Sequence, residues 1–258
     1  MSKIISIHSY RGGTGKSNTT ANLAALIAAQ GFRVGVVDTD LNSPGIHVPF
    51  GLDLEDENVV GYTLNDYLWG NCEIKDTAYE VTKNLDTAVS GHVFLVPASI
   101  KAGEITRLLK DGYDVALLNE GFDDLITALD LDVLLVDTHP GLSNETLLSI
   151  AITDVLIIIL RPDHQDYQGT AVTVQVARKL DVLEMMLIVN KLPTVYDFSD
   201  VKRRVENLYS CEVAAMLPHS DEMMALASQG VFVLRYPNHV IARELAQLAA
   251  RLVADLGA

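Results

Sequence analysis

The sequence predicts an α/β fold with a doubly wound, mostly parallel sheet of about seven or eight strands and helices on both faces. Short apolar runs alternate with segments of helical periodicity, which is typical of repeated strand–helix–strand units. A glycine-rich stretch, Tyr10–Ser17, stands between the first apolar run and the first helical segment. Several strands also end in a carboxylate, at the edge where open parallel sheets bind ligands.

The predicted strands are short runs of aliphatic residues, and several are apolar on both faces, as central strands of a parallel sheet are. Because helical segments separate them, consecutive strands are expected to run parallel. The expected strands are residues 3–8, 33–37, 92–96, 132–137, 154–160, 185–189 and 211–216.

The predicted helices have apolar residues at spacings of three and four, and the first stops at Gly31. Signals are weakest between residues 41 and 90, where a further helix is expected over 71–83. The other helices are expected at residues 17–30, 63–70, 100–110, 119–129, 144–152, 168–180, 198–209, 220–228 and 238–256.

Charge and hydrophobic composition limit which partners and which cellular compartment are expected. The net charge of −15 disfavours nucleic acid as a partner, although it leaves room for a local basic patch. No window of about 18 uninterrupted apolar residues and no secretory leader is present, so we expect a cytoplasmic protein without an integral membrane segment. The last helix carries Ile241, Leu245, Leu248 and Leu252 on one face, which favours packing on the core over a membrane anchor.

The chain is long enough for one large domain. Its 258 residues, 49% of them hydrophobic, can bury a substantial core, and we expect residues 1–258 to form a single domain. Cys72 and Cys211 lie far apart and form no C-x-x-C pair, so neither a disulfide nor a cysteine metal site is expected.

The stretch Arg11–Ser17 has the residue types that phosphate binding requires. Glycines let backbone N–H groups close around phosphate oxygens, and the N-terminus of the following helix adds partial positive charge. Lys16 can reach the β- and γ-phosphates, and the hydroxyl of Ser17 can bind Mg²⁺. The usual pattern G-x-x-x-x-G-K-[ST] is incomplete, because its first glycine falls on Tyr10 and a basic residue stands directly before Gly12.

Two strand ends supply carboxylates beside this loop: Asp38 and Asp40 after the second strand, and Asp137 after the fourth. Each alone is ordinary, since many strands end in a capping carboxylate. Together with the loop they predict a nucleotide site, in which one carboxylate holds the water shell of Mg²⁺ and another orients an attacking water.

In this order and spacing, the motifs resemble the MinD/ParA family of P-loop ATPases, whose phosphate loop is a deviant form of the Walker A motif. The resemblance implies a P-loop NTPase fold, a single P-loop ATPase domain over 1–258, and ATP and Mg²⁺ as cofactors. Residues 38–51, with Ser43–Gly45, are also similar to the Mrp/ApbC branch. The matching segments are residues 11–17, 37–40, 95–99, 135–141, 189–191 and 217–218.

The resemblance also implies roles for individual residues. Asp40 would position the hydrolytic water, and Lys16 and Arg11 would act on the phosphates. Mg²⁺ would be held by Ser17 directly and by Asp137 through water. The residues implied to bind the nucleotide are Gly12, Gly13, Thr14, Gly15, Lys16, Ser17 and Asn18 around the phosphates, with Asn190 and the backbone near Pro218 at the adenine.

Arg11 departs from the family, which has a lysine at this position that reaches the partner's phosphates in an ATP-bound homodimer. Arginine keeps the charge and adds a planar, bidentate fork. It could act as an arginine finger, or hold ATP in a dimer with slow turnover. In the third interpretation Arg11 points elsewhere and another basic residue replaces the lysine.

Three functions are compatible with these features. The first is an ATPase that hydrolyses ATP slowly with Mg²⁺ and acts as a nucleotide-dependent dimeric switch, which positions, partitions or regulates a protein partner. The second is an ATP-dependent, amide-forming or carboxylate-activating synthase of related fold, with a substrate pocket from residues 52–90. The third is a nucleotide-binding module that does not hydrolyse.

Overall fold

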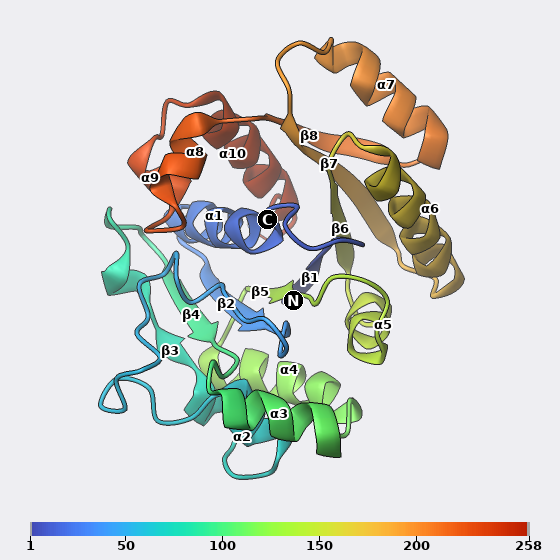
Figure 1. The fold of residues 1–258 in the computed structure, drawn as a ribbon. Helices are drawn as coiled ribbons and strands as arrows, with labels where there is room; N and C mark the ends of the chain where they lie inside the picture. The colour runs from blue at the N-terminus through green and yellow to red at the C-terminus, as the bar shows by residue number, and fades with distance from the viewer. Residues whose placement is uncertain (1, 257–258) are drawn as a thin grey trace.

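The fold is that of a computed structural model, which describes residues 2–256 (Figure 1). The strands lie in a single sheet in the order β3-β4-β2-β5-β1-β6-β7-β8, and every neighbouring pair is parallel except β3 and β4. This confirms the predicted fold class. The bounds are β1 (Lys3–His8), β2 (Arg33–Asp38), β3 (Tyr79–Glu80), β4 (His92–Val96), β5 (Val133–Asp137), β6 (Val155–Leu160), β7 (Glu184–Leu192) and β8 (Glu212–Pro218).

Helices cover both faces of the sheet (Figure 1). One face is covered by α1 (Lys16–Ala29), α8 (Asp221–Leu226), α9 (Phe232–Arg235) and α10 (Val240–Leu252). The helices of the other face are α2 (Leu64–Leu68), α3 (Ala102–Asp111), α4 (Ala116–Leu129), α5 (Asn144–Ala151), α6 (His164–Lys179) and α7 (Phe198–Tyr209).

The central strands are buried on both faces. In β5, Leu135 packs into the cluster that contains α1 and α10, whereas Leu134 and Val136 pack into the cluster that contains α4. All three side chains are fully buried. Because alternate side chains of a strand point to opposite faces, a strand covered on both sides reads as a continuous apolar run, which is why the sequence predicts it.

The last helix packs on the core as predicted. Ile241, Leu245, Leu248 and Leu252 of α10 are each at most 2% exposed. Among residues 2–256, no helix is both long and apolar enough to span a membrane.

The prediction of a helix over residues 71–83 is wrong. This segment forms two short 3₁₀ turns, η1 (Ile74–Thr77) and η2 (Thr82–Asn84), with the antiparallel edge strand β3 between them. A capping box between Glu73 and Asp76 supports a single turn, and Val81 is fully buried against the sheet. Tertiary packing therefore overrides the weak local periodicity.

Helices α6 and α9 also differ from the prediction, and α10 ends at Leu252, earlier than expected. Helix α6 begins at His164, earlier than expected, because the carboxylate of Asp163 accepts hydrogen bonds from the N–H groups of Gln165 and Asp166 and caps it. The short helix α9 is not predicted by the sequence; its Phe232 and Val233 are buried in the same cluster as α1.

Gly91 offers a test of the packing between the turn after α1 and the start of β4. A Cβ at this position would lie 2.1 Å from the carbonyl oxygen of Phe32 and 2.8 Å from that of Ala28. Because these are backbone atoms, G91A should lower the free energy of unfolding by about 1–3 kcal/mol in urea denaturation.

The matched control is G61A, because a Cβ at Gly61 meets no atom within 4 Å. G61A should change stability by less than about 0.5 kcal/mol. Equal stability of the two variants would contradict the packing described for Gly91.

Candidate functional site

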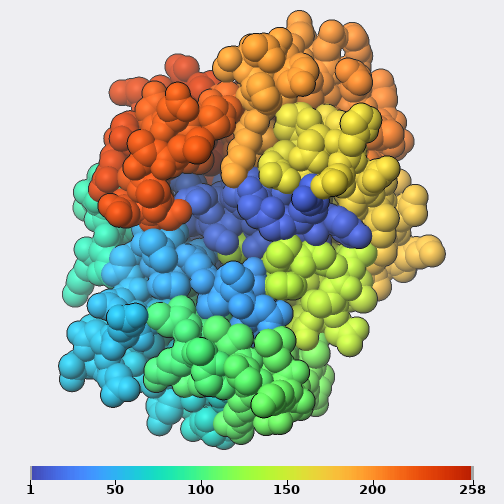
Figure 2. All heavy atoms as spheres, in the orientation of Figure 1, coloured from blue at the N-terminus to red at the C-terminus, as the bar shows by residue number. Residues whose placement is uncertain are grey.

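A cavity of about 400 Å³ lies at the carboxyl ends of the central strands β1, β2 and β5. In Figure 2 the dark-blue residues of the N-terminal stretch reach the surface in the middle of the face shown, with light-blue and yellow-green segments below them and orange and yellow segments above. The cavity is lined by Ser9, Gly12, Gly13, Thr14, Gly15, Lys16, Ser17, Asn18, Asp40, Ser43, Gly45, His139, Pro140, Lys191 and Ser228. The loop residues predicted to surround phosphates therefore all line one cavity.

The glycine-rich loop is held from two sides. The Asn190 side chain donates from Nδ2 to the carbonyl of Thr14, at 2.8 Å, and the Lys191 amine donates to the carbonyl of Gly13, also at 2.8 Å. Gly15 has φ of +97°, and a Cβ there would lie 2.4 Å from the Asn190 amide nitrogen. Only glycine satisfies both the left-handed backbone and this close approach.

Lys16 and Asp137 form a buried ion pair. The Lys16 amine lies 3.1 Å from Oδ1 of Asp137, and their side chains are only 7% and 1% exposed. The Thr20 hydroxyl also reaches this oxygen, at 3.4 Å. Lys16 stands at the start of α1, where the helix N-terminus adds partial positive charge.

The oxygen atoms of Asp137 and Ser17 are suitable ligands for a magnesium ion. Oδ2 of Asp137 is buried and has no hydrogen-bond partner among residues 2–256, which is unfavourable unless a further group occupies the site. Ser17 lines the adjacent cavity. A carboxylate and a hydroxyl are oxygen ligands of the type that Mg²⁺ prefers, with water completing its shell.

Asp38 anchors the chain after β2. Its two carboxylate oxygens accept the N–H groups of Asp40, at 3.0 Å, and of Gly45, at 3.1 Å. Asp38 is the register neighbour of Asp137 in the adjacent strand. Burial, reinforced by the charge of Asp137, raises the pKa of Asp38 to about 8.

Asp40 makes contacts to both neighbouring segments. Its Oδ1 accepts the N–H of Ser43, at 3.1 Å, and lies 2.6 Å from Nδ1 of His139 in the loop after β5. Asp40 and His139 both line the cavity. The structure thus places Asp40, which is predicted to position the water, in the same cavity as the predicted phosphate loop.

Arg11 is not brought to the cavity. Its guanidinium bonds to the side chain of Gln165 and lies 3.9 Å from carboxylate oxygens of Asp163 and Asp166, at the start of α6. The side chain is 41% exposed. In this single chain Arg11 points to α6, and which of the three interpretations holds in a dimer stays a prediction.

The residues predicted for adenine lie beside the cavity. Asn190 is 4% exposed and its amide already holds the loop and the N–H of Lys191. Pro218 pairs with Leu192 at the carboxyl ends of β7 and β8, next to a second depression of about 580 Å³. Their contact with a base remains a prediction.

Lys191 and His139 are among the cavity residues for which the sequence predicts only membership of a matching segment. Lys191 follows the predicted Asn190 and has φ of +55°, so its side chain turns back to the loop. The sequence signal for Lys191 was its place at a strand end in a matching segment. His139 stands within the segment matched after β5, but its partner Asp40 is 99 residues away in sequence.

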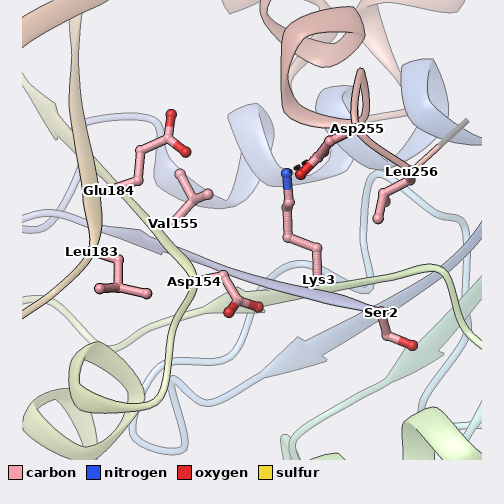
Figure 3. A pocket seen from close by; sticks show the side chains of 8 residues that line it. All are labelled: Ser2, Lys3, Asp154, Val155, Leu183, Glu184, Asp255 and Leu256. Carbon is pink, nitrogen blue, oxygen red and sulfur yellow. Dashed lines mark hydrogen bonds and ion pairs between the residues drawn. The ribbon is translucent and has the colours of Figure 1, made fainter. Parts of the chain in front are cut away.

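A larger depression of about 540 Å³ lies at the opposite end of the sheet (Figure 3). Its charged residues are already engaged: Lys3 pairs with Asp255 at 2.6 Å, and Asp154 accepts the N–H of Ile4. The exposed Leu183 also lines it. It lacks the convergent backbone donors of the loop cavity, so we assign the chemistry to the latter.

The fold, the loop and its lysine–carboxylate pair define a P-loop nucleotide-binding protein. Residues 2–186 match the protein family described as an AAA domain. The chain belongs to this family and to the MinD/ParA family of P-loop ATPases, and the predicted resemblance is confirmed.

Several relatives match along most of their length. An uncharacterised ATP-binding protein of Methanocaldococcus jannaschii is 27% identical over 98% of this chain and 88% of its own. The flagellum site-determining protein YlxH of Helicobacter pylori is 26% identical over 98% of this chain and 83% of its own. The solved septum site-determining protein MinD of Pyrococcus horikoshii, complexed with Mg-ADP, has a TM-score of 0.80 at 23% identity and covers 100% of this chain and 99% of its own.

His8 makes stability pH-dependent. It is fully buried at the end of β1, and burial, followed by the charges of Lys16 and His139, lowers its pKa from 6.5 to about 3. The folded state therefore keeps His8 neutral while the unfolded chain binds a proton below pH 6.5, and stability falls as pH falls between 6.5 and 3. Between pH 6.5 and 5 this one group should remove on the order of 1–2 kcal/mol from the free energy of unfolding.

The variant H8N isolates this effect. The Thr138 hydroxyl donates to the carbonyl of Ile7 and so accepts from Nδ1 of His8, at 2.8 Å, a bond that the asparagine amide can replace. Urea denaturation should show a smaller acid-induced loss for H8N by about that amount. The exposed H164N serves as the control and should keep the wild-type loss; equal losses in all three proteins would refute the prediction.

Proposed function

We propose that this protein is a Mg²⁺-dependent ATPase that acts as a nucleotide-switched dimer and positions or regulates a protein partner. The observation that carries the proposal is the single cavity in which a glycine-rich loop, the Lys16–Asp137 pair and Asp40 converge. The family supports ATP hydrolysis in general, and its members are P-loop ATPases.

Each residue has a role in the proposed mechanism. Backbone N–H groups of Gly12–Ser17 and the amine of Lys16 bind the phosphates, and Asn190 and Lys191 fix the loop. Asp40 orients a water toward the terminal phosphate. Ser17 and Asp137 would hold Mg²⁺, which neutralises charge on the phosphate oxygens when bound.

The proposed use of this chemistry is positioning. The names of two relatives describe them as site-determining proteins, one for the flagellum and one for the septum. A switch of this kind binds a partner in one nucleotide state and releases it in the other. We extend that role to this chain, with a protein partner that reads the ATP-bound state.

The synthase alternative shares its fold with a solved cobyrinic acid a,c-diamide synthase of Mycobacterium smegmatis, at a TM-score of 0.76 and 19% identity, but the site does not support it. No residue between 46 and 138 lines the loop cavity of the described structure, so residues 52–90 contribute no wall to a substrate pocket there. We therefore rank the switch ATPase first.

Hydrolysis is tested with D40N. Asparagine keeps the size of Asp40 but removes the charge that orients the water, so turnover of Mg-ATP should fall by about 100-fold while ATP affinity stays within about twofold. Phosphate release and binding of a fluorescent ATP analogue measure the two quantities.

The control for D40N is D53N, which removes an exposed carboxylate outside the cavity and should leave turnover unchanged. If D40N hydrolyses ATP at the wild-type rate, Asp40 does not orient the water. If the wild-type protein binds ATP but never turns it over, the protein is a non-hydrolysing module.

Dimerisation is tested by light scattering coupled to size exclusion. The chain has a mass of 28.1 kDa, and we expect this mass with ADP and about twice this mass with a non-hydrolysable ATP analogue. R11A should weaken the dimer at least tenfold if Arg11 leaves α6 to reach the partner's phosphates. The exposed R204A on α7 is the control, and an unchanged R11A dimer would confine Arg11 to its contacts with α6.

A further inference from the structure

The contact between His139 and Asp40 joins two loops that the sequence separates widely. His139 follows β5, and Asp40 follows the neighbouring strand β2. Nδ1 of His139 lies 2.6 Å from Oδ1 of Asp40, which is within strong hydrogen-bond distance. Since an ionised carboxylate only accepts hydrogen bonds, Nδ1 carries the proton and donates.

This contact leaves the two carboxylate oxygens of Asp40 in different situations. Oδ1 accepts from His139 and from the N–H of Ser43. Oδ2 receives no hydrogen bond from residues 2–256, although Asp40 lines the cavity beside Lys16 and the loop. One oxygen is thus fixed by the protein, and the other is left to accept from a water in the cavity.

His139 is itself held in place. Its carbonyl accepts the hydroxyl of Thr146 at 3.2 Å, which ties the loop to the first turn of α5. The adjacent Thr138 donates to the carbonyl of Ile7 and accepts from His8, so the backbone on both sides is anchored. A ring on an anchored backbone can fix the orientation of its partner carboxylate.

We propose that His139 is a positioning residue for hydrolysis: it fixes the rotamer of Asp40 so that Oδ2 meets the attacking water. The inference rests on the proposed ATPase function and adds to it a residue whose role is not on the phosphates. Without His139, Asp40 keeps only the Ser43 contact and gains rotational freedom, so turnover falls while nucleotide binding is retained.

The first test separates binding from turnover. H139A should lower kcat for Mg-ATP by about tenfold or more and change ATP affinity by less than about twofold. H139N places an amide N–H near the position of Nδ1 and should restore most of the rate. The control is H92N. His92 pairs with Glu80 at the start of β4, the end of the strand remote from the cavity, so H92N should leave kcat unchanged.

A double-mutant cycle tests whether His139 acts through Asp40. In the D40N background H139A should cost less than about twofold, because the group that it orients is gone. Full additivity of the two losses would overturn the inference. So would a loss in H139A that H139N does not restore, or one that appears as weaker ATP binding.

A spectroscopic measurement does not depend on turnover. In ¹⁵N-histidine NMR of the nucleotide-free protein, the His139 ring should be protonated at Nδ1, with a downfield proton signal that D40N removes. The inference is overturned if the wild-type protein lacks this downfield signal or if D40N retains it. A wild-type ATPase that H139A leaves unchanged contradicts the inference alone, whereas a wild-type protein that binds ATP without turnover contradicts the hydrolytic function and this role together.

Discussion

The ion pair between Lys16 and Asp137 joins the first helix to the middle of the sheet, and the site is arranged around it. Both charges are almost completely buried, and removing one partner of such a pair costs about 3–5 kcal/mol because the other is left uncompensated. Lys16 and Asp137 can separate only if each finds another partner of opposite charge. Phosphate would be that partner for Lys16, and Mg²⁺ for Asp137. In the proposed mechanism, nucleotide binding therefore exchanges partners instead of exposing bare charges. Lys16 would turn to phosphate, and Asp137, whose second oxygen accepts no hydrogen bond from residues 2–256, would bind the hydrated ion.

The other polar groups follow from where the parallel strands end. β1, β2 and β5 are adjacent, so His8, Asp38 and Asp137 all stand at one edge of the sheet, where burial makes each charge costly. The protein meets this cost differently at each position. His8 is kept neutral by its lowered pKa, the pKa of Asp38 is raised, and Asp137 is paired with Lys16. Charge is thus concentrated on the groups that face the cavity, and the neighbours behind them hold the loops by hydrogen bonds.

Much of this was predictable from sequence, because local patterns determine it. The strands are continuous apolar runs and the phosphate loop is a contiguous motif, so β1, α1 and the loop between them were placed within a residue or two. The failures have a common cause in long-range packing: β3 exists only because β4 provides its partner, and Val81 is buried by the sheet rather than by a helix of its own. The same holds in the site. Gly15 and Lys16 could be assigned from the motif, whereas the contact of His139 with Asp40 depends on the register of β2 against β5, which no local pattern encodes.

The position of Arg11 has a physical consequence for the dimer. The Arg11 side chain is 41% exposed and its guanidinium lies 3.9 Å from both Asp163 and the buried Asp166, and long ion pairs of an exposed cation contribute about 0–1 kcal/mol. Asp166 does not depend on Arg11, because Arg161 bonds to it at 3.0 Å. Release of Arg11 from α6 therefore leaves no buried charge unpaired and costs little. A partner's phosphates, with a bidentate geometry that guanidinium matches, would outweigh this contact, so the conformation seen in one chain does not oppose a role across a dimer. Lys191, in contrast to Arg11, is not free to move at low cost. Its amine donates to the carbonyl of Gly13, so moving it would also release the glycine-rich loop.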